Sequence, residues 1–197
     1  MPPQKKNSSR QQTHRVRIIG GEWRGRKLDI VDVPELRPTP DRVRETLFNW
    51  LQLHIIGKHC LDLFSGTGAL GFEALSRGAT SATFVDENPA VIKQLQQNKN
   101  ILQAGNADII KANVTQWLEK NQTTFDVVFM DPPYRKNLVI PVCNMLEQNG
   151  WLSDEAWIFI EQEKEAPVPQ LPGNWTIQKE TGAGQVSCYL AWRKSAG

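Results

Sequence analysis

From residue 59 onward, short apolar segments alternate with amphipathic ones, and this alternation leaves the chain few possible architectures. The apolar segments predict strands at 59–64, 81–86, 107–112, 125–130 and 156–162. The amphipathic segments predict helices at 69–77, 89–103, 114–120 and 138–148. Short hydrophobic strands separated by helices pair in parallel and are covered on both faces. We therefore predict an α/β fold with a mostly parallel, Rossmann-like sheet.

The end of the chain departs from this parallel pattern. A proline-rich segment at 166–173 is followed by two more predicted strands, 174–180 and 186–193. The glycine-containing segment 182–184 joins them, and such a short connection makes the two strands an antiparallel pair.

The first 57 residues differ from the rest in both composition and pattern. Residues 1–14 are polar and basic, which predicts a disordered tail. Two short strands are predicted at 15–19 and 27–31, on either side of a loop that combines glycines, arginines and an exposed Trp23. The predicted division of the chain is a tail at 1–14, an N-terminal extension at 15–57 and a main domain at 58–197.

A helix is predicted after this loop. Thr39 is a suitable N-cap and Pro40 suits the first helical position. The core-facing side is predicted from the helical spacing of Val43, Leu47, Trp50 and Leu51. Arg44 falls at the edge of that apolar side, where a structural ion pair is the expected explanation.

Positive charge is concentrated at the N-terminus. The chain has 23 Lys and Arg against 21 Asp and Glu. Residues 1–27 hold eight basic residues and one acid (+7), which leaves 15 basic and 20 acidic residues (−5) in 28–197. An acidic body with a basic arm predicts a polyanionic partner, and arginines with glycines and a tryptophan suit RNA phosphates and bases. The candidate RNA-binding residues are Arg15, Arg17, Trp23, Arg24, Arg26 and Lys27.

Several classes of protein are disfavoured by the bulk features of the chain. No segment approaches the ~20 apolar residues of a membrane span, and the N-terminus lacks the apolar centre of a secretory signal. Cys60, Cys143 and Cys188 match neither a zinc spacing nor a disulfide framework. We expect a cytoplasmic monomer without a metal site or a membrane partner.

A glycine-rich loop follows the strand predicted at 59–64. Gly66, Gly68 and Gly71 fit the pattern G-x-G-x-x-G, which is the dinucleotide fingerprint. Asp86 ends the next strand, 20 residues after Gly66, where an acid can bind ribose hydroxyls. The motif predicts an adenosine-type ligand at a topological switch point, and alone it fits NAD as well as S-adenosylmethionine.

Other residues favour S-adenosylmethionine over NAD. Asp62 lies inside the strand, in the pattern D-x-F-x-G-x-G with Phe64, where a carboxylate can receive the ammonium group of the cofactor. NAD enzymes usually keep that strand apolar. Simple dinucleotide domains also tend to begin with this strand, whereas about 58 residues precede it in this chain. Asn113 follows the third strand, where its amide could contact the adenine edge, although a plain surface Asn also fits there.

The tetrapeptide 131–134, Asp-Pro-Pro-Tyr, directly follows the strand predicted at 125–130. Asp131 and the carbonyl of Pro132 can accept both protons of a nucleobase amine, which favours a pyramidal nitrogen with a free lone pair. The prolines fix φ and lack an N–H, so the carbonyls are rigidly aimed, and Tyr134 can stack on the base. We predict Asp131, Pro132 and Tyr134 as catalytic residues of an amino-methylating enzyme. Whether Asp131 accepts a proton or only a hydrogen bond stays open at this point.

The order of these motifs resembles class I S-adenosylmethionine-dependent methyltransferases, and D-P-P-Y resembles the signature of those that methylate amines. Three blocks narrow the resemblance to the RsmD family. They are RIIGGEWRGRKL at 17–28, RPTPDRVRE at 37–45 and DLFSGTGALG at 62–71. The resemblance covers roughly residues 15–194.

This resemblance implies methylation of the exocyclic N2 of a guanine, at position 966 of bacterial 16S ribosomal RNA in the small subunit, with S-adenosylmethionine as cofactor. It also implies a seven-stranded sheet whose last strand is antiparallel. By position it implies that Gly66, Gly68 and Asp86 bind the cofactor, and that Asp131 and Tyr134 hold the target base.

Two other interpretations stay open. D-P-P-Y also serves adenine-N6 methylation of DNA or RNA, although this chain is short for a separate target-recognition region. A non-catalytic RNA-binding ribosome-assembly factor with a relic cofactor pocket is the alternative from another class.

Overall fold

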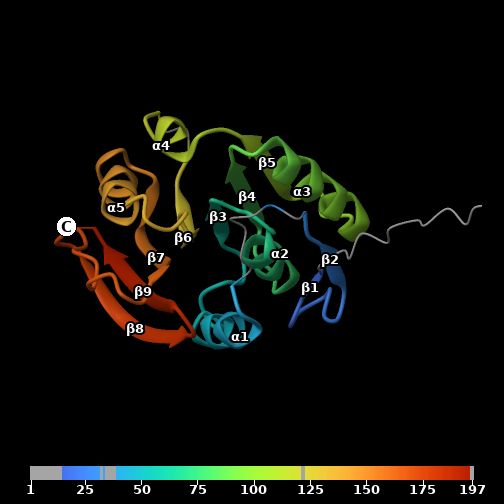
Figure 1. The fold of residues 1–197 in the computed structure, drawn as a ribbon, viewed down its shortest axis with the longest axis horizontal. Helices are drawn as coiled ribbons and strands as arrows, with labels where there is room; N and C mark the ends of the chain where they lie inside the picture. The colour runs from blue at the N-terminus through green and yellow to red at the C-terminus, as the bar shows by residue number, and fades with distance from the viewer. Residues whose placement is uncertain (1–14, 32, 34–38, 121–122, 196–197) are drawn as a thin grey trace, which may run out of the picture.

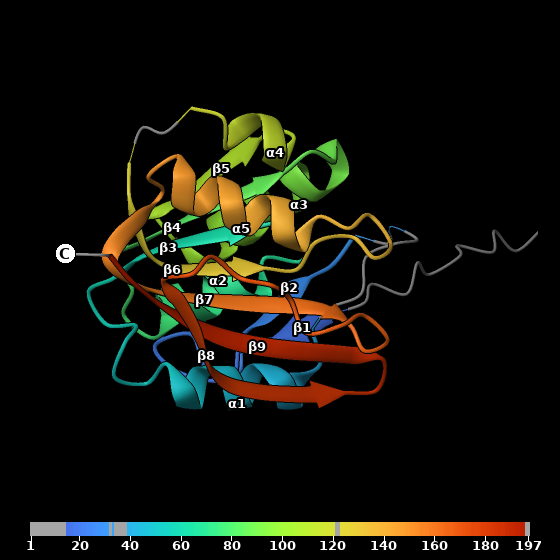
Figure 2. The same cartoon turned by 90° about the vertical axis from the view of Figure 1, so that its left-hand side faces the viewer.

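The computed structural model describes residues 15–31, 33, 39–120 and 123–195, so the tail predicted at 1–14 lies outside the described residues. Seven strands form one sheet in the order β5-β4-β3-β6-β7-β9-β8 (Figures 1 and 2). In chain order they are β3 (His59–Leu63), β4 (Ser81–Asp86), β5 (Ala107–Lys111), β6 (Phe125–Met130), β7 (Leu152–Glu163), β8 (Trp175–Ala183) and β9 (Val186–Lys194).

The pairing of these strands confirms the predicted fold class. β3 pairs in parallel with β4 and β6, β4 with β5, and β6 with β7. The last strand, β9, lies antiparallel between β7 and β8. β7 begins at Leu152, earlier than predicted, because polar residues such as Glu155 pair through their backbones with β9 and add no apolar signal.

Helices cover both faces of the sheet, as predicted. They are α1 (Asp41–Trp50), α2 (Ala69–Ser76), α3 (Pro89–Leu102), α4 (Val114–Trp117) and α5 (Val139–Gln148). Side chains alternate along β6, so Val127 and Phe129 join the core under α1, α2 and α3, whereas Val128 and Met130 join the core under α4 and α5. No helix in the described part of the chain has the length and apolar character needed to cross a bilayer.

The N-terminal extension is built onto the core of the main domain. Strands β1 (Arg15–Arg17) and β2 (Lys27–Asp29) form the predicted antiparallel hairpin. Val16 and Leu28 of this hairpin are buried in the same cluster as Phe72 and Phe84 of the main domain. The predicted boundary after residue 57 rests on a change in the sequence pattern, and the division of the chain into domains there stays a prediction.

The prediction that Thr39 caps α1 is wrong. The helix begins at Asp41 with Pro40 as N-cap, in an extended conformation and without a side-chain capping bond. The rigid φ of Pro40 already sets the turn into the helix. The Thr39 side chain is buried and its hydroxyl is hydrogen-bonded to Glu161 on β7 instead.

Arg44 makes the structural ion pair that was expected of it. Its side chain is fully buried, and its guanidinium donates to Asp41 Oδ1 at 2.6 Å and to the carbonyl of Arg17 at 3.0 Å. Its Nη1 also lies 4.0 Å from Glu73 Oε2, a fully buried carboxylate on α2. These contacts tie α1, the hairpin and α2 together.

Candidate active site

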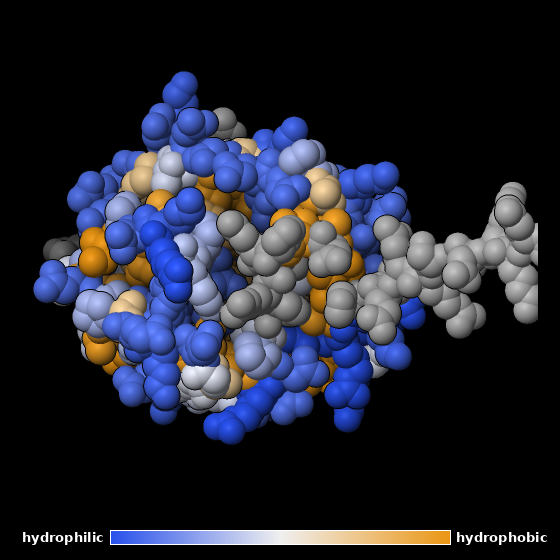
Figure 3. Space-filling view, viewed as in Figure 1, coloured by the Kyte–Doolittle hydropathy of each residue, from blue (hydrophilic) through white to orange (hydrophobic). Residues whose placement is uncertain are grey.

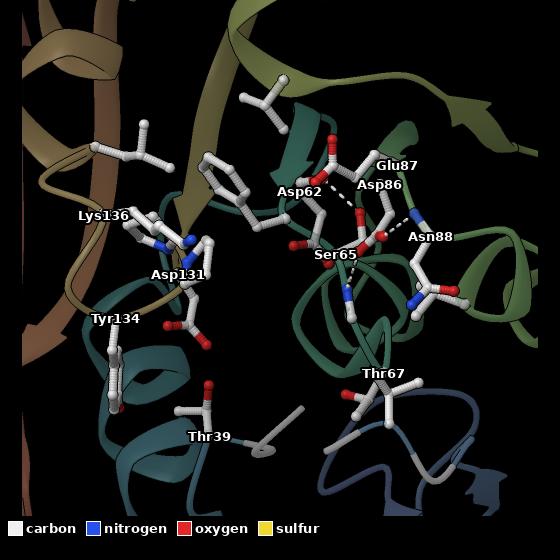
Figure 4. Close-up of a pocket in the computed structure, with 18 of the residues that line it drawn as sticks. Thr39, Asp62, Ser65, Thr67, Asp86, Glu87, Asn88, Asp131, Tyr134 and Lys136 are labelled. Atoms are coloured by element: carbon white, nitrogen blue, oxygen red, sulfur yellow. Dashed lines mark hydrogen bonds between the residues drawn. The ribbon is translucent and has the colours of Figure 1, made fainter. Parts of the chain in front are cut away.

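A single cleft of about 850 Å³ lies at the carboxyl ends of the central parallel strands. It opens where the strand order reverses between β3 and β6, which is the expected ligand position in an open α/β sheet. The predicted site residues that line it are Asp62, Phe64, Gly66, Asp86, Asn113, Asp131, Pro132 and Tyr134. Figure 4 shows Asp62, Ser65 and Asp86 on one side of the cleft, with Asp131 and Tyr134 on the other.

The glycine loop after β3 is held in place by backbone contacts. Phe64 and Gly66 both have positive φ, 58° and 50°, and the N–H of Gly66 donates to Asp86 Oδ2 at 3.0 Å. Gly68 does not line the cleft; its φ is 72°, and a Cβ there would lie 2.5 Å from Leu95 Cδ2. Glycine is therefore required at Gly68 for packing beneath the loop.

Asp62 is buried in the cleft wall. Its Oδ2 accepts a hydrogen bond from the N–H of Gly71 at 2.9 Å. Burial raises the pKa of Asp62 to about 8, because the hydrogen bond from Gly71 offsets the desolvation of the carboxylate only in part. A buried carboxylate of this kind is suited to a cationic ligand group, which would restore its ionised form.

Asp62→Asn is expected to stabilise the protein in a pH-dependent way. Because the pKa of Asp62 is raised on folding, its contribution to stability is full below about pH 4 and is lost as the pH rises through about 8. Asn keeps the oxygen acceptor for Gly71 but never ionises. The melting temperature of the variant should therefore exceed that of wild type by several degrees more at about pH 8 than at about pH 5. The exposed Asp108→Asn is the control, and an equal difference at both pH values would contradict the prediction.

The side chains of Asp86 and Asn113 are both hydrogen-bonded within the protein. Asp86 accepts from the N–H groups of Gly66 and Asn88, and burial nevertheless raises its pKa above the ordinary value. The Asn113 side chain caps α4 and donates from Nδ2 to Glu87 Oε2 at 2.9 Å. Asn113 therefore lies where the sequence analysis expected it, but its amide already has a structural role.

The tetrapeptide 131–134 forms the opposite wall. The pKa of Asp131 is raised well above its usual range by burial first, and then by the charges of Glu161 and Asp62. The pKa of the half-buried Tyr134 is also raised, mainly by burial and by Glu161. The following loop is fixed because the N–H of Arg135 donates to a carboxylate oxygen of Glu163.

The candidate RNA-binding residues lie on the hairpin, where Figure 3 shows a strongly hydrophilic surface at the lower right of the view. Arg15 is paired with Asp29 at 2.7 Å, and Arg26 donates to the carbonyl of Ile101 at 2.6 Å. Arg17 and Lys27 are exposed and stand opposite each other in the hairpin register. Like charges in that position are destabilising without an anion between them, which favours an anionic partner at this place.

The expectation of an exposed Trp23 is wrong. Trp23 is half-buried against the core, and its backbone N–H donates to Ser76 Oγ at 2.9 Å. Gly21 packs so closely on α2 that a Cβ there would lie 1.8 Å from the carbonyl oxygen of Ser76. The N–H groups of Ile19 and Gly20 bond to Glu73. The loop therefore docks the extension onto α2, and the amides of Ile19, Gly20 and Trp23 are already hydrogen-bonded within the protein.

Comparison with known proteins agrees with this geometry. The family model described as Conserved hypothetical protein 95 matches residues 16–192. The chain is 50% identical over 182 residues to the Escherichia coli K12 protein named "Ribosomal RNA small subunit methyltransferase D", covering 92% of each chain. It is 46% identical over 179 residues to the Haemophilus influenzae protein of the same name, covering 89% of this chain and 92% of that one. A solved structure from Escherichia coli, described as the candidate methyltransferase yhhF, matches with 48% identity and a TM-score of 0.86 over 92% of this chain and 99% of that one.

Proposed function

This chain belongs to the RsmD family, and from that membership we propose that it methylates the exocyclic N2 of a guanine in small-subunit ribosomal RNA, with S-adenosylmethionine as cofactor. One observation carries the proposal. A single cleft is lined both by the glycine loop, at Phe64 and Gly66, and by the D-P-P-Y segment, at Asp131 and Tyr134. A methyl donor and an amino-bearing base would meet in it.

The polar side chains that line the cleft fit S-adenosylmethionine. Asp62 offers a buried carboxylate to the ammonium group, and Asp86 offers acceptors to the ribose hydroxyls beside the turn at Gly66. For Asn113 to contact the adenine edge, its amide would exchange its bond to Glu87 for one to the cofactor. When bound, the cofactor supplies an electrophilic methyl group on a sulfonium centre.

The residues of the D-P-P-Y segment act on the target amine. Asp131 and the carbonyl of Pro132 accept hydrogen bonds from the two N–H groups of the amine, which directs the lone pair of the nitrogen toward the methyl group. The fixed φ of the prolines keeps these acceptors in place, and Tyr134 stacks on the base. Orienting two bound reactants lowers the barrier by several kcal/mol.

The choice of guanine N2, at position 966, is supported by the resemblance in residues 17–28 and 37–45, because D-P-P-Y alone fits adenine N6 as well. The test is to incubate the protein with labelled S-adenosylmethionine and unmethylated small subunits, or with the free RNA, and to map the modified nucleotide. Label at a guanine N2 supports the proposal. Label at adenine N6 points to the second enzyme class, and a protein that binds RNA but not S-adenosylmethionine is a non-catalytic assembly factor.

The basic hairpin gives a separate prediction about RNA affinity. Arg17→Gln with Lys27→Gln should weaken RNA binding and flatten its salt dependence, since each lost phosphate contact removes about 0.7–0.9 from the slope of log K against log salt. Measuring the dissociation constant over a range of salt concentrations checks this. The matched control is Lys120→Gln with Lys179→Gln, two exposed lysines outside the hairpin. An unchanged slope in the hairpin variant would place the RNA surface elsewhere.

A further inference from the structure

Glu161 is a buried acid that the sequence analysis did not single out. It lies on β7, and the register between β6 and β7 ends with Phe129 beside Phe159 and Met130 beside Ile160. The next residues along the two strands are Asp131 and Glu161. Neighbouring strands lie ~4.8 Å apart and alternate residues share a face. Two carboxyl groups therefore leave the sheet side by side at the edge of the cleft.

The groups that face this acid pair come from several elements. Among the described residues, the charges that act on Asp131 are those of Glu161 and Asp62. Cys188 on β9 lies beside Glu161, with its Sγ 3.9 Å from Oε2. Tyr134 and Glu163 are further titratable neighbours. These groups are all acidic. The cations Arg135 and Lys136 line the same cleft, but the charges that act on Asp131 are those of Glu161 and Asp62.

Two carboxyl groups in this situation retain a proton between them. Burial and the neighbouring acids raise the pKa of Asp131 well above its usual range, and burial raises the pKa of Glu161. Like charges one strand spacing apart do not both ionise near neutral pH. Glu161 is only 2% exposed, whereas Asp131 lines the cleft. Thr39 and Cys188 nevertheless hydrogen-bond to the Glu161 carboxylate and favour its ionised form, whereas the pKa of Asp131 is raised further, so the negative charge stays on Glu161 and the proton on Asp131.

Thr39 lies between the two acids. Its hydroxyl is hydrogen-bonded to Glu161, and Figure 4 shows the same hydroxyl pointing toward the Asp131 carboxylate. Thr39 is 6% exposed and lines the cleft. It belongs to the block 37–45 of the N-terminal extension, so the extension supplies part of the cleft's acid network.

We propose that Glu161 and Thr39 are positioning residues for Asp131: the charge of Glu161 keeps the single proton of the acid pair on Asp131, and Thr39 bridges the two carboxyl groups, so that both residues orient Asp131 and set the pH above which it is ionised toward the cleft. The proposal rests on the proposed function, because an ionised Asp131 is the acceptor that a target amine requires. It also assigns the N-terminal extension a task in the cleft beyond RNA contact.

The first test follows the titration of Asp131 in the full-length protein without RNA or cofactor. Carboxyl ¹³C resonances are recorded against pH, and the Asp131 signal is assigned by its loss in Asp131→Asn. In Glu161→Gln, the Asp131 midpoint should fall by about one pH unit or more, a tenfold loss of proton affinity, since the neighbouring charge is gone. Glu155→Gln, an exposed position on the same strand, should leave the midpoint unchanged.

The second test uses the rate of RNA methylation across the same pH range. The acidic limb of the kcat profile should move to lower pH in Glu161→Gln by the same amount as the Asp131 midpoint. Thr39→Val keeps the side-chain volume without the hydroxyl, and it should lower kcat several-fold while the KM for S-adenosylmethionine stays the same. Thr39→Ser should restore kcat. A role in folding alone would lower the yield of active protein without moving the pH profile.

The outcomes separate this inference from the proposed function. An Asp131 midpoint that is equal in wild type and Glu161→Gln would overturn the shared proton, whether or not the enzyme is active. An unchanged kcat in Thr39→Val would overturn the bridging role. A wild-type protein with the expected titration that methylates no RNA would leave the acid pair standing and refute the proposed function.

Discussion

Asp131→Asn is expected to reduce kcat by roughly 10²–10⁴-fold, the range for removal of a positioned proton or hydrogen-bond acceptor. The Asn side chain has the same shape, but its amide presents donors as well as an acceptor to the incoming amine. Because the other wall of the cleft carries the cofactor candidates Asp62 and Asp86, the dissociation constant of S-adenosylmethionine should change little. Single-turnover rates and cofactor titrations measure the two quantities separately.

The control for this variant is Asp154→Asn, an exposed aspartate on β7 that lies outside the cleft lining. The melting temperature of both variants shows whether either is unfolded. Removal of a buried acid with a raised pKa should leave Asp131→Asn as stable as wild type, or more so, at neutral pH. Turnover within twofold of wild type would exclude Asp131 from the chemistry.

The strands and helices of the main domain could be predicted because each signal is local. Residues 127–130 are apolar on both faces of their strand, as expected for a strand that helices cover on both sides. The glycine loop and the tetrapeptide 131–134 follow such strands directly, so their meeting in one cleft is a consequence of parallel pairing. Pattern and position were sufficient for that part of the site.

The errors concern side chains whose partners lie far away in the sequence. Thr39 has the composition of an N-cap, but its partner Glu161 is 122 residues later. Trp23 lies in a loop with Gly20 and Gly21 and was expected to be exposed, yet the close approach of Gly21 to Ser76 brings this loop onto α2. In the sequence, Glu161 is a charged residue within a predicted buried strand. Its position beside Asp131 depends on the β6–β7 register, which sequence periodicity does not predict.

The second large effect is expected at Glu73, the fully buried carboxylate that joins the extension to α2. Its oxygens accept from the N–H groups of Ile19 at 2.7 Å and Gly20 at 2.8 Å, and from Arg77 Nε at 2.7 Å. Arg44, also fully buried, lies 4.0 Å away. Glu73→Ala would leave Arg44 short of its opposite charge and two backbone donors without an acceptor. Breaking a buried ion pair from one side costs ~3–5 kcal/mol, so the free energy of unfolding should fall by about that amount.

Urea denaturation measures this loss, with Glu119→Ala at an exposed position as the matched control. Glu73→Gln should fall between wild type and Ala, because one oxygen acceptor remains while the charge is lost. Since Glu73 holds the loop that follows β1, limited proteolysis should cut the Ala variant within the extension before the main domain. A Glu73→Ala protein with the wild-type urea midpoint would mean that the shared apolar core, through Val16, Ile18 and Leu28, docks the extension without help from the buried ion pair.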